Sequence, residues 1–380
     1  MKTISRLLSL ALLAAAFALP ALAQDPAATP NPCESQERTD MYTDYYNSKK
    51  GDAAAQKHAR DVAGNYMQKY GTCNDQYTKA VQKFIDAYDQ AVGSFNLQNK
   101  LVDSYTKKQF PEAVSAAKEM LAKNPDDVRT AILGAWAAYQ GVVAKNTALT
   151  PDALNLAQRA QQLLQSGKTA DNYFFNSKEE AQDWMEYVLG AANIKDNPAE
   201  AAKHLIAVAQ SNTSAAKEPT TYYLLANAYQ DEWSKLNDKY KTFTTETDES
   251  KIILANMKLA VDRIVDAYAR AVAFSTKPEQ QAAKATYLKT LTDIYKEQHG
   301  GSEAGLNEMI ASIGTKPLLI TTPVTTVPAE TPATGTGDGT NGTKPPTATT
   351  PSTTPAATPT PAPAAAPKPT PTPSKKPPVH

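Results

Sequence analysis

The chain has 380 residues and carries 39 basic and 39 acidic side chains, so its formal net charge is zero. Sixteen of its 27 prolines lie in residues 321–380, a stretch without any aromatic residue. Because the middle of the chain has no basic excess, the composition argues against a nucleic-acid-binding protein or one that binds an anionic membrane.

Residues 1–23 have the layout of a secretory signal peptide. Lys2 and Arg6 precede an apolar run that ends at Leu19, and after Pro20 the small residues Ala21 and Ala23 form a cleavage-site pattern. The apolar run is too short for a membrane span, which needs about 20 residues. We therefore expect an exported protein of the periplasm, the cell envelope or the extracellular space, with no membrane span after cleavage.

The sequence contains two cysteines, Cys33 and Cys73. In an oxidising compartment, a pair of cysteines more often forms a disulfide than remains as two free thiols. Cys33 precedes a helix expected to begin near Glu37, and Cys73 follows a helix expected to end near Tyr70. An antiparallel arrangement of these two helices would bring the cysteines together, so we predict a Cys33–Cys73 disulfide.

From about residue 38 to residue 314, apolar residues recur at intervals of three and four, which is typical of amphipathic helices. Turn-forming residues separate the helices, so the sequence predicts an all-α fold of antiparallel helix pairs. The expected organisation is a linker (24–37), a divergent helical unit (38–92), a helical repeat domain (93–316) and a tail (317–380). The polar stretch 231–250 is expected to connect two helices.

Several segments carry similar spacings. One first-helix pattern consists of Tyr222, Leu225, Ala226 and Tyr229, and one second-helix pattern runs from Phe110 to Pro125. A leucine precedes a glycine at Gly134 and Gly190, where the missing side chain would let a neighbouring helix approach closely.

These patterns resemble the tetratricopeptide-repeat (TPR) family. The alanines at the start of second helices, Ala113, Ala153 and Ala201, are 40 and 48 residues apart, so the repeats diverge from the family period of about 34. The resemblance implies a right-handed α-solenoid whose first helices line a groove for peptides or partner proteins.

The resemblance also implies which residues face that groove. Mapped onto the best-matching helix, the groove positions are Tyr223, Asn227 and Gln230, and the preceding unit contributes Tyr187 and Ala191. Asparagine can hydrogen-bond an extended peptide backbone in both directions, and tyrosine offers a flat surface with a polar tip.

The tail, residues 317–380, is built mainly from threonine, proline and alanine, so we expect it to be disordered with extended stretches. It could be a spacer or a tether to the cell envelope, an O-glycosylated stalk, or a passive solvating segment.

Motifs for catalysis are weak. Lys168 and Thr169 end a segment like a phosphate-binding loop, but Gln162 stands where that loop needs glycine. We therefore assign no catalytic, cofactor or metal residues.

The sequence favours a non-enzymatic, exported scaffold or adaptor that binds a protein or peptide. The alternatives are a glycan-directed envelope-remodelling enzyme or its helical accessory, and a purely structural secreted protein.

Overall fold

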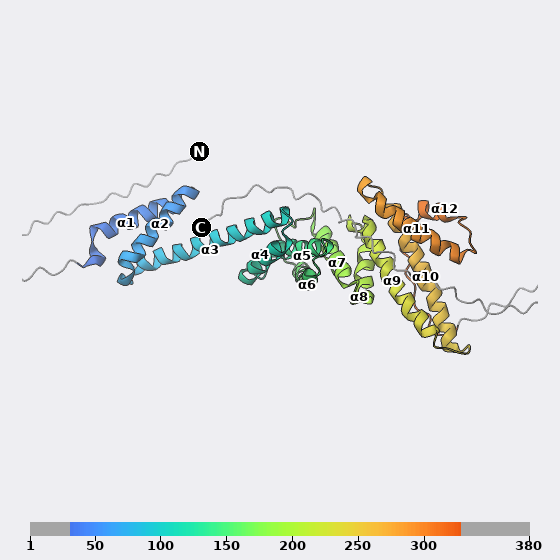
Figure 1. Ribbon diagram of the computed structural model, residues 1–380. Helices are drawn as coiled ribbons and strands as arrows, with labels where there is room; N and C mark the ends of the chain where they lie inside the picture. The colour runs from blue at the N-terminus through green and yellow to red at the C-terminus, as the bar shows by residue number, and fades with distance from the viewer. Residues whose placement is uncertain (1–30, 328–380) are drawn as a thin grey trace, which may run out of the picture. The chain divides into compact units, whose positions relative to one another are not determined.

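The computed structural model describes residues 31–327. This part of the chain consists of α-helices and short 3-10 turns joined by loops, and it contains no strands (Figure 1). The predicted all-α class is thereby confirmed for the described residues. The predicted signal peptide (1–23), residues 24–30 of the linker and residues 328–380 of the tail lie outside them.

Twelve α-helices follow one another in the described residues. The first six are α1 (Gln36–Ser48), α2 (Ala53–Tyr70), α3 (Gln76–Thr106), α4 (Phe110–Lys123), α5 (Val128–Val143) and α6 (Thr150–Gln165). The last six are α7 (Lys178–Asn193), α8 (Pro198–Ala209), α9 (Pro219–Tyr240), α10 (Asp248–Phe274), α11 (Gln281–Gln298) and α12 (Leu306–Ile313).

The described chain forms two compact units, residues 31–91 (unit 1) and residues 92–327 (unit 2). The division falls within α3.

Unit 1 pairs α1 with α2 and adds the first part of α3. Side-chain caps fix where these helices begin: Ser35 accepts a hydrogen bond from the Arg38 amide, and Asp52 accepts from the Ala54 and Ala55 amides. Their shared core is small and rich in tyrosine. Its buried members are Tyr45, Ala59, Ala63, Tyr66, Tyr70, Val81, Phe84 and Ile85.

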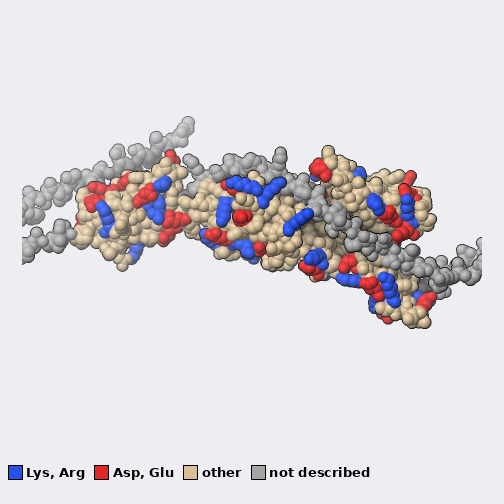
Figure 2. Space-filling view, in the orientation of Figure 1, with Lys and Arg blue, Asp and Glu red and all other residues tan. Residues whose placement is uncertain are grey.

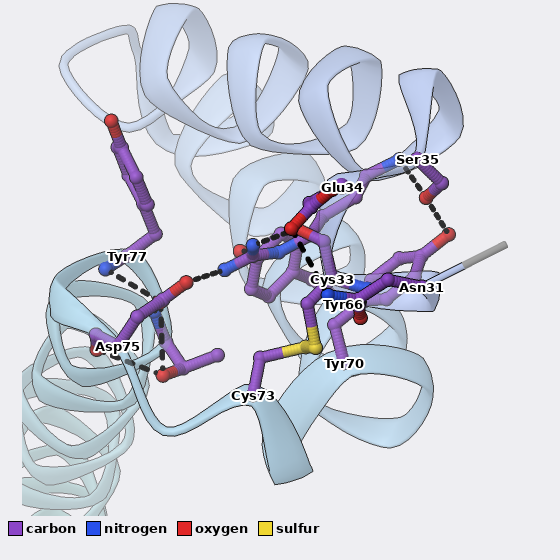
Figure 3. The surroundings of a disulfide bond; sticks show 11 residues. Asn31, Cys33, Glu34, Ser35, Tyr66, Tyr70, Cys73, Asp75 and Tyr77 are labelled. Atoms are coloured by element: carbon purple, nitrogen blue, oxygen red, sulfur yellow. Dashed lines mark hydrogen bonds and ion pairs between the residues drawn. A yellow bond between two sulfur atoms is a disulfide. The ribbon is translucent and has the colours of Figure 1, made fainter.

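A disulfide joins Cys33 and Cys73, the pairing that the sequence predicts (Figure 3). Their Cα atoms lie 5.7 Å apart, within the range that an unstrained bridge needs. The bridge connects the residues just before α1 to those just after α2, so it closes the antiparallel pair at its open end.

Arg38 reinforces the same end of unit 1. Its side chain is buried, donates from Nε to the Tyr66 hydroxyl at 2.9 Å, and also bonds the Cys33 carbonyl and the Asp75 carboxylate. Asp75 itself accepts from the Tyr77 and Thr78 amides at the start of α3 (Figure 3). Arg38 therefore links α1, α2 and α3 next to the disulfide.

In unit 2, each helix from α4 to α10 packs against the next one along the chain, and both α11 and α12 pack on α10 (Figure 1). α5 also contacts α7, and α7 also contacts α9, so these alternate helices form a row. The core contains alanines, aromatic residues and leucines from all these helices, with Trp136, Tyr187, Leu205, Leu225 and Leu291 fully buried.

Two glycines allow close helix packing, as the sequence predicts. A Cβ atom added at Gly134 would lie 2.8 Å from the Ala117 Cβ on α4, and one at Gly190 would lie 2.6 Å from Leu205 Cγ on α8. Real carbon atoms do not approach this closely, so the missing side chains set the distance between paired helices.

The polar stretch 231–250 differs from the expectation. Helix α9 continues through it to Tyr240, and α10 begins at Asp248, so only a short turn remains between them. Ion pairs support this extension: Lys235 bonds Asp231 one turn earlier, and Lys239 bonds Glu249 on α10.

The beginning of the tail also differs from the expectation. The sequence places residues 317–327 in a disordered tail, but the structure orders them in an extended conformation along α10. The reason lies in side chains of α10 that bind their main chain, described next.

Candidate functional site

One face of α10 holds an extended segment of the same chain. The face carries Asn256, Asp266 and Arg270, and we call these three residues the docking face; residues 317–327 form the strap. Asn256 and Arg270 are 14 residues apart, which is close to four helical turns and keeps both on one side of α10.

Asp266 and Arg270 form a buried, two-pronged ion pair. Arg270 Nε lies 2.8 Å from Asp266 Oδ2, and Nη2 lies 3.2 Å from Oδ1. The side chains are only 10% and 4% exposed, respectively. Each partner has bonding capacity left for the strap: Arg270 Nη2 donates to the Pro317 carbonyl at 2.6 Å, and Asp266 Oδ2 accepts from the Leu319 amide at 3.5 Å.

Asn256 binds the far end of the strap in both directions. Its Oδ1 accepts from the Val324 amide at 2.8 Å, and its Nδ2 donates to the Val324 carbonyl at 2.9 Å. Nδ2 also donates to the Ile252 carbonyl of the preceding turn at 3.0 Å, which fixes the orientation of the amide group. Asn256 thus bonds one residue of an extended chain as a neighbouring strand would.

The spacing of these contacts shows that the strap runs antiparallel to α10. Between Arg270 and Asn256 the helix rises about 21 Å, at about 1.5 Å per residue. From residue 317 to residue 324, an extended chain spans about 22 Å at about 3.1 Å per residue. The two lengths match, so the strap follows α10 without slack.

Burial along the strap has a period of three. Leu318, Thr321 and Val324 are half-buried, whereas Leu319 and Ile320 are 38% and 50% exposed. A polyproline-II helix has three residues per turn, so one residue in three faces the supporting surface. Leu318 also packs against the core of unit 2.

All strap groups that the docking face bonds belong to the main chain. They are the Pro317 carbonyl, the Leu319 amide, and the Val324 amide and carbonyl. This arrangement recognises an extended backbone rather than particular side chains.

Two residues expected to face a groove are buried in unit 2. Tyr187 is fully buried, and its hydroxyl lies 2.8 Å from the Tyr139 hydroxyl and 2.9 Å from Thr220 Oγ1. Burial raises the pKa of both tyrosines, so they remain protonated and can donate. Tyr223 is 6% exposed and stacks on Tyr287, with ring centroids 4.9 Å apart.

The other three expected groove residues are half-buried. Ala191 lies on α7, and Asn227 and Gln230 lie on α9. The Tyr268 hydroxyl donates to Gln230 Oε1 across a distance of 3.4 Å, so Gln230 contacts α10. The five positions therefore do not form one exposed surface, because α8, α10 and α11 cover much of α7 and α9.

Asn256, Asp266 and Arg270 were not predicted from the sequence. Two signals were present: an Asp–Arg pair at a spacing of four in the otherwise uncharged last third of α10, and the apolar run Leu318 to Ile320 just after the last helix. Neither signal alone indicates that the two segments meet.

The histidines of the described residues take separate structural positions. His58 pairs with Asp44 in unit 1, His204 Nδ1 lies 2.6 Å from Glu186 Oε2, and His299 ends α11. Within residues 31–327, no three histidine, cysteine, aspartate or glutamate side chains gather as a metal site would require.

On the face in Figure 2, basic and acidic side chains are interspersed over both units.

Comparison of the chain with protein-family models, with curated proteins and with solved structures gives no match in any of the three. Among the helices of residues 31–327, none combines the length and the apolar character needed to cross a bilayer.

Proposed function

We propose that this protein is an exported, non-enzymatic scaffold that binds an extended segment of a partner protein. The observation that carries the proposal is the strap on α10. It demonstrates a helical surface whose side chains bond the main chain of an extended polypeptide at both ends.

The helix arrangement supports a TPR-like solenoid as the framework. Antiparallel pairs follow one another from α4 to α10, and α5, α7 and α9 form a row, as first helices do in a helical-repeat array. The site proposed here lies on α10, the second helix of its pair, whereas the family groove is lined by first helices.

The disulfide supports export, because such bonds persist in oxidising compartments outside the cytosol. We place the protein in the periplasm or elsewhere in the cell envelope. Its proline-rich tail would give the folded part reach from an attachment point.

Site-specific photo-crosslinking in the exporting cells tests this function. A photoreactive residue at Ile252, one turn from Asn256 on the docking face, should trap another protein in a discrete adduct. The matched control places the same residue at exposed Gln162 on α6, where no adduct of that size should form. Equal adducts from both positions, or none from Ile252, would contradict the proposal.

A further inference from the structure

We propose that the strap is an intramolecular competitor, which occupies the docking face until a matching segment of a partner replaces it. The partner segment is extended, uncharged and rich in threonine, proline and aliphatic residues. This inference rests on the proposed function and adds the chemical class of the ligand and a means of regulation.

The strap is held in a way that permits exchange. Its bonds to the docking face use main-chain atoms, and most of its side chains are exposed. Leu318 is its one contribution to the packed core of unit 2 within the described residues. A segment with few buried apolar contacts opens at a lower free energy than the packed helices beneath it.

The side chains of the docking face are also held by groups outside the strap. Asp266 and Arg270 hold each other by two bonds, and Asn256 is held by the Ile252 carbonyl. An incoming segment therefore meets donors and acceptors already in place, which lowers the entropic cost of binding.

The bonding pattern defines the ligand. Amide hydrogens are needed at the positions of Leu319 and Val324, so a ligand must lack proline at two positions five residues apart. Proline is tolerated at the positions of Pro317 and Pro323, where it favours the extended conformation. The ion pair of the docking face is internally neutral and the strap has no charged residue, which favours an uncharged ligand.

A synthetic peptide tests exchange directly. The probe is a labelled, end-capped peptide of residues 317–327, measured by fluorescence anisotropy. The receptor is the full mature chain carrying Leu319→Pro and Val324→Pro, which removes the two strap amides but leaves α10 unchanged. Circular dichroism of this strap variant establishes that its helices are intact.

We expect saturable binding to the strap variant and at least about tenfold weaker binding to the wild-type chain, whose own strap competes at high effective concentration. Adding Asn256→Ala to the strap variant should weaken binding about tenfold, because two hydrogen bonds are lost. Asn256→Asp keeps the acceptor for the amide but sets a carboxylate oxygen against the Val324 and Ile252 carbonyls, so it should bind no better than Asn256→Ala. A peptide with proline at the Val324 position loses one of these two bonds and should bind about three- to tenfold more weakly than the original.

Absence of peptide binding to the strap variant, or equal binding to all variants, would overturn the inference. So would exchange of straps between two copies, detected as a wild-type dimer by sedimentation. Failure of the peptide test while Ile252 still traps a partner would leave the proposed function standing. Peptide binding without any trapped partner would support exchange at the docking face and contradict the proposed function.

Discussion

The two units of this protein hold their helices together by different means. Unit 1 has a small tyrosine-rich core, and a disulfide and the Arg38 bonds close one end of it. Unit 2 has a much larger core in which glycine and alanine let helices approach closely, and it contains no cysteine. The difference indicates that a covalent link stabilises the unit whose helices can bury little apolar surface, whereas stacked pairs stabilise the other.

Removing the disulfide should change the stability of one unit relative to the other more than any other substitution considered below. Cys33→Ser with Cys73→Ser opens a loop with a sequence separation of 40 residues. The loss of that constraint should lower the free energy of unfolding of unit 1 by about 4 kcal/mol in the chain-entropy model. Hydrogen exchange with mass spectrometry should find faster exchange in α1 and α2 and unchanged exchange in α5 to α8. Equal acceleration in both units would show that their stabilities are not separate.

A methyl group at Gly190 should disturb unit 2 instead. Gly190→Ala places its Cβ 2.6 Å from Leu205 Cγ and 3.3 Å from the Ala201 carbonyl oxygen, so helices α7 and α8 must move apart. We expect a loss of about 1–3 kcal/mol in urea unfolding.

The matched control for this change is Gly93→Ala in α3, where an added Cβ meets no atom within 4 Å. Because alanine favours helix more than glycine does, this variant should be more stable by about 0.5–1 kcal/mol. If both variants lost the same stability, close approach at Gly190 would not be the reason for its loss.

A smaller effect concerns a buried carboxyl group of unit 2. Burial raises the pKa of Glu218, which precedes α9, above its ordinary value. The folded state therefore holds the proton more tightly than the unfolded state, and the stability contributed by this group falls as the pH rises above about 4.5. Glu218→Gln should raise the melting midpoint at pH 7.5 and change it little at pH 4. A larger gain at pH 4 would contradict this assignment.

Local sequence patterns predicted much of the fold. The helices follow from apolar spacing and capping residues, the disulfide from two cysteines at the ends of adjacent helices, and the close contacts from Gly134 and Gly190. In each of these cases, the residues that contact one another lie on the same helix or on helices that are neighbours in the sequence.

The docking face does not follow from such local patterns. Asn256 and Val324 are 68 residues apart, and a polar residue on a helix ordinarily faces solvent. The expected groove positions depended on the register of α7 and α9, in which Tyr187 and Tyr223 are buried by neighbouring helices. A single sequence does not show how many helices cover a given one.

The claim that α10 binds an extended main chain is tested most directly by residue-resolved hydrogen exchange of the strap in the mature protein. The account predicts slow exchange for the Val324 amide, and to a lesser degree for the Leu319 amide, relative to the intervening Ile320 and Thr322. Asn256→Ala should abolish the protection of Val324, and Lys258→Ala, an exposed position on the same helix, should preserve it. Exchange of both strap amides at the rate of an unstructured peptide would contradict the account.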